Sequence, residues 1–152
     1  GETRGLSRIA FPDWRPVFER FAELPNVACF REQAESLVDL VQNVSLTTEQ
    51  MTTDLDFQQS LAQLFTLLPY GQLILEQAEL VEVERDIVDL VFATLVRDFS
   101  ATAIELHGKA SSTEAQQQWA IDSVRKPVVD EPGEDHVYAE VRALSGAYVM
   151  PA

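Results

Sequence analysis

The chain has 152 residues, 46% of them hydrophobic and only 6 of them glycine, a composition typical of one folded domain and not of a disordered segment. Its 25 acidic and 11 basic side chains give a formal net charge of -14, which disfavours binding to nucleic acid or to anionic lipid. The single cysteine, Cys29, excludes an internal disulfide, and its apolar neighbours indicate a buried thiol in a reducing cytoplasm.

The first part of the chain predicts an irregular lead-in followed by two helices. Residues 1–16 show no helical period. Apolar side chains then recur at helical spacing over residues 17–24, which predicts a short helix that Pro25 ends. Asn26 is a candidate cap for the next helix, which the i, i+3, i+4, i+7 apolar pattern predicts over residues 27–44.

The middle of the chain predicts a pair of helices interrupted by a proline. Around the polar run 45–53, three residues are candidate helix caps: Thr47, Thr48 and Asp54. The helical period resumes at Leu55. Pro69 disfavours helical backbone at the residue before it, so we expect a kinked pair of helices that meet at this proline.

The clearest helical period covers residues 84–108. Its apolar side chains form one broad face, and Gly108 is a plausible C-cap. Residues 111–114 read Ser-Ser-Thr-Glu, the form of a capping box, and predict the start of another helix. A turn-rich linker over residues 128–133 and a last amphipathic helix over residues 134–148 complete the chain.

These patterns predict an all-α fold. No segment alternates as a strand does, so we expect a single domain over residues 1–152, a bundle of about five to seven helices with no sheet. The most apolar stretch, residues 61–75, is interrupted by polar residues, proline and glycine, and no signal peptide is recognised. The sequence therefore predicts no transmembrane segment.

No motif predicts catalysis or metal binding. His107 and His136 are not at metal-ligand spacings; the first fits a helix C-terminus and the second a solvated pair with Asp135. Glycine-rich phosphate loops and nucleophile signatures are absent from the sequence. Four carboxylates are interpreted as a solvated acidic face: Glu76, Glu79, Glu82 and Glu84. Arg97 and Asp98, inside the clearest helix, predict a structural ion pair across the bundle.

The second half of the chain contains several segments that resemble the helical C-terminal region of acyl-CoA dehydrogenases. They are Val-Arg-Asp-Phe-Ser (96–100), Leu-His-Gly-Lys (106–109), Ser-Ser-Thr-Glu-Ala-Gln (111–116), Arg-Lys-Pro-Val-Val-Asp (125–130) and the ending Tyr-x-Met-Pro (148–151). Members of this family are flavoproteins that oxidise acyl-CoA thioesters with FAD and a catalytic carboxylate. Their catalytic core combines an N-terminal helical domain, a β domain and a C-terminal helical bundle.

The resemblance implies a non-catalytic, appended C-terminal domain of such an enzyme. His107 and Gly108 match the leucine-histidine-glycine-glycine turn that approaches FAD across a subunit interface, and they are the cofactor-binding candidates. Lys109 stands where the family has its second glycine, and no segment corresponds to the tyrosine-glutamate-glycine that carries the catalytic base. The chain itself would therefore hold no cofactor, and FAD would belong to the parent enzyme.

Two other classes of function stay open. A free-standing acidic helical module could mediate interaction or oligomerisation, because amphipathic helices are abundant. A helical pocket could bind an apolar small molecule, because Phe and Leu are abundant. The expected partner is the remainder of the parent enzyme, or a second subunit, including a second copy in a homodimer.

Overall fold

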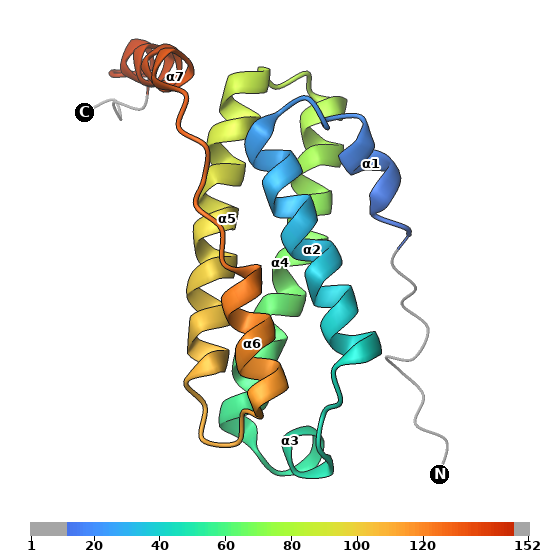
Figure 1. The fold of residues 1–152 in the computed structure, drawn as a ribbon. Coiled ribbons are helices and arrows are strands. Elements are labelled where there is room, and N and C mark those ends of the chain that lie inside the picture. The colour runs from blue at the N-terminus through green and yellow to red at the C-terminus, as the bar shows by residue number, and fades with distance from the viewer. Residues whose placement is uncertain (1–11, 148–152) are drawn as a thin grey trace, which may run out of the picture.

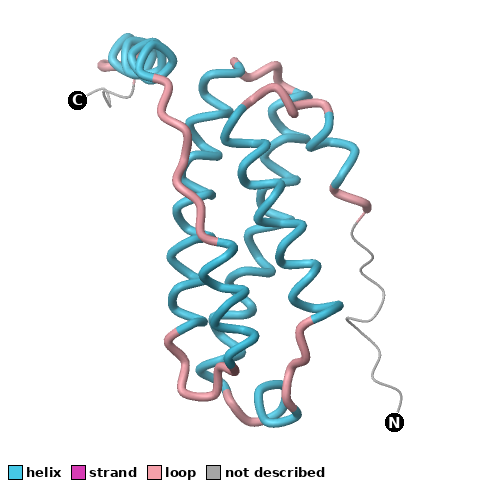
Figure 2. Tube along the Cα trace, viewed as in Figure 1, coloured by secondary structure: helices cyan, strands magenta, loops and turns pink. Residues whose placement is uncertain are grey.

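The computed structural model describes residues 12–147, which form seven helices and no strand (Figure 1, Figure 2). This confirms the all-α prediction. The helices are α1 (Arg15–Glu19), α2 (Pro25–Asn43), α3 (Thr48–Thr52), α4 (Leu55–Leu80), α5 (Arg85–His107), α6 (Glu114–Ser123) and α7 (Glu131–Ala143). Most of the predicted lead-in, and Tyr148 at the predicted end of the last helix, lie outside the described residues. Residues 144–147 form turns, so the last helix ends earlier than predicted.

Helix α5 is the central element of the bundle. It contacts α2, α4, α6 and α7, and Figure 1 shows the long helices α2, α4 and α5 side by side with the shorter α6. Its fully buried side chains include Phe92, Val96 and Leu106, which face the apolar stripes of its neighbours. The broad apolar face that the sequence predicts for this helix thus serves several partners at once.

Aromatic rings fill the part of the core between α1, α2, α4 and α5. The Phe18 ring stacks on Phe30 at a centroid distance of 6.0 Å, and Phe92 meets Phe30 edge to face at 5.5 Å. Gly71 of α4 brings the helix backbone against these rings, because a Cβ there would lie 3.0 Å from the Phe30 ring. The aromatic side chains that suggested an internal ligand pocket therefore pack against one another.

Pro69 does not divide α4 into two helices, so the prediction of a pair is wrong. A single helix runs from Leu55 to Leu80 with the proline inside it. A proline inside a helix removes one backbone hydrogen bond and costs about 3 kcal/mol. Buried residues on both sides of Pro69, among them Leu64 and Leu75, hold the two halves to the same core and offset that cost.

The boundary between the first two helices also differs from the prediction. Helix α1 covers only Arg15–Glu19, and Pro25 begins α2 instead of ending the helix before it. A proline suits the first turn of a helix, whose N–H groups have no partner within the helix. Asn26 therefore does not cap α2, and its side chain bonds elsewhere.

Two other helix starts are capped by threonine. Thr47 and Thr113 accept hydrogen bonds from the backbone N–H groups of Gln50 and Gln116, and each glutamine side chain accepts one from the backbone of its cap residue. The capping box predicted at residues 111–114 is therefore wrong by two positions. Glutamine replaces glutamate as the third residue of the helix in both boxes.

Helix α7 stands apart from the bundle, at the end where α5 begins (Figure 1). Of the described helices it contacts only α5, and it spans Glu131–Ala143, so part of the predicted linker is helical. Val137 is buried, whereas three apolar residues of its predicted stripe are exposed: Tyr138, Val141 and Leu144. None of the helices within residues 12–147 is both long enough and apolar enough to cross a membrane.

Candidate functional site

The two residues that the resemblance links to FAD lie at the end of α5. His107 is half-buried, and Gly108 is an exposed C-cap with a φ of -81°, in the right-handed helical region. The nearest atom to a Cβ at Gly108 would be the Glu105 carbonyl oxygen at 3.6 Å, which is an ordinary contact. Residues other than glycine fit this position, and the flavin contact stays a prediction that rests on the resemblance.

His136 lies against α5 instead of pairing with Asp135 as predicted. Its Nε2 is 2.6 Å from Glu84 Oε2, and both side chains are exposed. The hydrogen bond to Glu84 raises the pKa of His136 above its ordinary value of 6.5, and the negative charges of Glu84, Asp86 and Glu140 raise it further. The contact joins α7 to the beginning of α5.

The other ionisable residues that the sequence singled out are dispersed. Arg97 and Asp98 are both exposed, and neither forms an ion pair with another residue in the 12–147 range, so the predicted ion pair across the bundle is wrong. Cys29 is half-buried, and burial raises the pKa of its thiol. A protonated thiol is a weak nucleophile at neutral pH.

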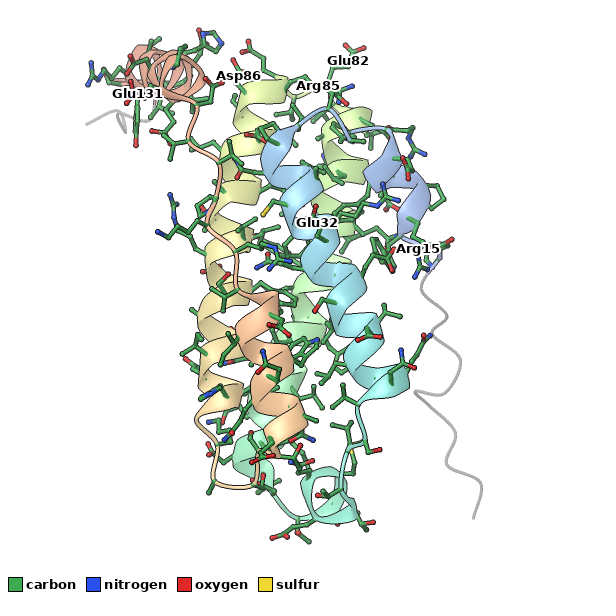
Figure 3. The ribbon with its side chains drawn as sticks, in the orientation of Figure 1. Arg15, Glu32, Glu82, Arg85, Asp86 and Glu131 are labelled. Carbon is green, nitrogen blue, oxygen red and sulfur yellow. The ribbon has the colours of Figure 1, made fainter. Side chains whose placement is uncertain are left out.

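The four carboxylates interpreted as a solvated acidic face are indeed exposed, three of them with partners. Glu79 accepts from the Arg20 guanidinium, which lowers the pKa of the carboxyl, and Glu76 accepts from Gln72. Within the described residues, no group of three or more His, Cys, Asp or Glu side chains is arranged to hold a metal ion. Figure 3 shows the acidic side chains Asp86 and Glu131 at the end of the bundle where α5 begins.

The buried polar side chains are engaged in the fold itself. Asp89, on α5, accepts hydrogen bonds of 2.8 Å from both the backbone and the side-chain amide of Asn26. The Asn26 side chain also exchanges two hydrogen bonds with the backbone of Val128 and so ties the segment before α7 to α2. Sequence reasoning missed this contact, because Asn26 and Asp89 are separated by 63 positions.

A second buried polar pair joins the two threonine-capped helix starts. Gln50 Nε2 donates to Gln116 Oε1 at 2.8 Å, and Gln116 Nε2 donates to Gln50 Oε1 at 2.9 Å. Both residues are fully buried. The repeated Thr-x-x-Gln spacing was the signal that could have pointed to them. These groups hold the bundle together.

An apolar groove runs between the C-terminal half of α4 and the N-terminal half of α5, and it has a volume of about 520 Å³. Its lining contains aliphatic and aromatic side chains and one glutamine: Tyr70, Leu73, Ile74, Gln77, Ala78, Val83, Ile87, Val88 and Val91. Tyr70 is 54% exposed, Leu73 59% and Val91 38%. Apolar side chains gathered at a solvent-facing groove indicate a surface for contact with another molecule.

A polar groove of about 680 Å³ lies between the N-terminal half of α4 and the C-terminal half of α5. It is lined by small and polar side chains and two carboxylates: Gln59, Ala62, Gln63, Thr66, Leu67, Asp98, Ala101, Thr102 and Glu105. The linings of the two grooves contain no lysine or arginine. One outer face of α4 and α5 thus combines an apolar half with a hollow, negatively charged half.

Comparison with known proteins gives no relative: no family model matches the chain, and neither does any curated protein or solved structure. The resemblance to acyl-CoA dehydrogenases therefore stays a prediction that rests on the short segments of the second half.

Proposed function

We propose that the chain is a non-catalytic helical module that packs against another protein surface through the apolar groove of α4 and α5. The observation that carries this proposal is the exposure of Leu73, Tyr70 and Val91 along one groove. Burying such side chains stabilises a complex by roughly 25 cal/mol for each Å² of apolar surface removed from water. The hydrogen bonds between Asn26 and Asp89 indicate that the buried polar groups stabilise the fold.

Following the resemblance, the surface that the groove contacts belongs to a flavin-dependent acyl-CoA dehydrogenase of which this chain is a C-terminal part. FAD and the catalytic carboxylate would then lie in the parent enzyme, and only His107 and Gly108 would approach the cofactor. The reading frame upstream of Gly1 tests this assignment. We expect it to encode a flavin-binding core. A start codon directly before the Gly1 codon would rule the assignment out.

Cysteine accessibility tests the use of the groove. In a Cys29→Ala background, Leu73→Cys should react rapidly with a maleimide in the isolated chain and slowly in the complete protein, where the groove is covered. Met51→Cys is the matched control, because Met51 on α3 is 54% exposed, close to the 59% of Leu73, and lies outside both grooves. Equal labelling rates of Leu73→Cys in the two contexts would contradict the proposal.

Self-association is a second candidate function, which the exposed apolar residues of α7 favour. Tyr138 and Val141 of α7, and its C-cap Leu144, face solvent, and α7 packs only against α5 among the described helices. Two copies could bury these side chains against each other around a two-fold axis. Sedimentation equilibrium distinguishes the two functions: a dimer that Val141→Ser dissociates supports this candidate, and a monomer at all concentrations removes it.

A further inference from the structure

The outer face of α4 and α5 has the shape and the charge of a site for one more helix. The apolar and polar grooves follow each other along the same two helices: Leu67 and Tyr70 lie one turn apart on α4, and Val91 and Asp98 lie two turns apart on α5. Residues seven apart in a helix share a face. The two grooves are therefore parts of one surface that runs along the bundle.

We propose that the partner segment is a cationic amphipathic helix. It lies lengthwise on α4 and α5, with its apolar side chains in the apolar groove and lysine or arginine side chains beside Asp98 and Glu105. The inference rests on the proposed function and adds the chemistry of the partner.

The dimensions of the face favour a helix as the occupant. The groove is bounded by helices of 26 and 23 residues, and an amphipathic helix buries its apolar stripe in such a groove through residues at i, i+3, i+4 and i+7. Helices pack at interaxial distances of about 8–10 Å, and small side chains permit the shorter distances. Ala62, Thr66 and Ala101 are such residues, and they line the polar groove.

The charges of the face favour a cationic partner over a second copy of the chain. Asp98 and Glu105 are exposed, and neither carboxylate has a side-chain hydrogen bond or ion pair to any residue within 12–147. The chain carries a formal charge of -14, so two copies meeting on this face would bring like charges together. Complementary charges across an interface accelerate association and exclude wrong partners.

The experiment uses two synthetic helical peptides with the same leucine stripe, one with lysine and one with glutamate on the flanks. Binding to the protein is measured by fluorescence anisotropy. We expect the lysine peptide to bind at least about tenfold more tightly than the glutamate peptide. The double charge reversal Asp98→Lys/Glu105→Lys should remove this preference, and Leu73→Ser/Val91→Ser should weaken binding of the lysine peptide.

The matched control is Asp39→Lys/Asp122→Lys, which changes the net charge by the same amount outside the two grooves. Asp39 is exposed in the second half of α2, and Asp122 is exposed in the last turn of α6. These changes should leave the affinity for the lysine peptide within about twofold. A loss equal to that of Asp98→Lys/Glu105→Lys would show general attraction to an acidic protein and overturn the inference.

Further outcomes separate this inference from the proposed function on which it depends. One outcome is that the two peptides bind equally well to the wild-type protein while Leu73→Ser/Val91→Ser weakens both. In that case the groove is a contact surface, but its partner is not cationic. If Leu73→Ser/Val91→Ser does not change peptide binding, and Leu73→Cys is labelled at equal rates in the isolated chain and the complete protein, both proposals fail. Circular dichroism of each variant confirms that it is folded.

Discussion

The two sides of α5 are built differently. Toward α2 and α6, buried polar side chains fix the neighbours in place: Gln33 Nε2 donates to Ser100 Oγ at 2.9 Å, and Asp89 accepts two hydrogen bonds from Asn26. On the outer face that α5 shares with α4, aliphatic side chains such as Val91 face solvent. Hydrogen bonds specify one geometry, whereas an apolar surface accepts several. The first side determines the fold, and the second leaves room for a partner.

The largest loss of stability should come from breaking the polar side. Asn26→Ala removes the side-chain donor to Asp89 and both bonds to Val128. Hydrogen bonds to charged groups contribute about 1.5–3 kcal/mol, so we expect the free energy of unfolding to fall by about 2–3 kcal/mol in urea titrations.

A double-mutant cycle with Asp89→Ala gives the control for that loss. If the pair interacts as the distances indicate, Asn26→Ala/Asp89→Ala should be clearly more stable than the sum of the single changes implies. Additive effects would show that the two side chains do not interact.

A smaller loss is expected where α4 meets the aromatic core. In Gly71→Ala the new methyl group lies 3.0 Å from the Phe30 ring, which is held between other rings. Overpacking costs about 1–3 kcal/mol, and alanine returns about 1 kcal/mol through its helix propensity, so we expect a net loss of about 1 kcal/mol in thermal unfolding. Gly108→Ala, where no contact is tight, should be neutral or stabilising.

The attachment of α7 should depend weakly on pH. The pKa of His136 is raised in the folded protein by its hydrogen bond to Glu84, so its contribution is fully present below the unfolded value of about 6.5. It is lost as the pH rises through the higher folded value. NMR shifts of the α7 amides should therefore titrate with the His136 ring, and His136→Gln should abolish that titration. Unchanged α7 shifts in wild type would show that the His136–Glu84 contact does not attach α7 to α5.

The smallest effect on stability is expected on the outer face. Leu73→Ser replaces a side chain that is already 59% exposed, so the free energy of unfolding should change by less than about 0.5 kcal/mol. A loss comparable with that of Asn26→Ala would mean that the apolar groove supports the fold, and the contrast between the two sides of α5 would disappear.

The sequence predicts best what depends on local periodicity. Helices α2 and α5 are predicted within two residues of their observed ends, because their apolar stripes are long and regular. Helix α4 was predicted as two, because a proline indicates a break unless distant packing overrides it. The sequence offers Thr47 as a cap, and the Thr-x-x-Gln spacing is a local signal for the boxes at Thr47 and Thr113. The contact between the two glutamines joins residues 66 positions apart, so it leaves no such signal.

The candidate surface could not be predicted for a different reason. In the sequence, Val91 belongs to the same apolar stripe as Phe92 and Leu95, and the pattern cannot show that a stripe this broad extends beyond its partners. Only the packing of the neighbouring helices shows that Phe92 is buried and that Val91 is exposed. The polar half of the face could not be predicted either, because the sequence indicates an ion pair for Asp98 and Arg97 and gives no sign that Asp98 lines a groove.

The reciprocal Gln50–Gln116 contact has a consequence for the order of synthesis. Each glutamine completes the cap of its own helix and satisfies the amide of the other, so neither buried side chain has its full set of partners until both are present. On a ribosome, α3 therefore emerges with an incomplete hydrogen-bond network, which stays incomplete until residue 116 has left the exit tunnel. The end of the bundle that contains α3 can complete these hydrogen bonds only after the start of α6 has been synthesised.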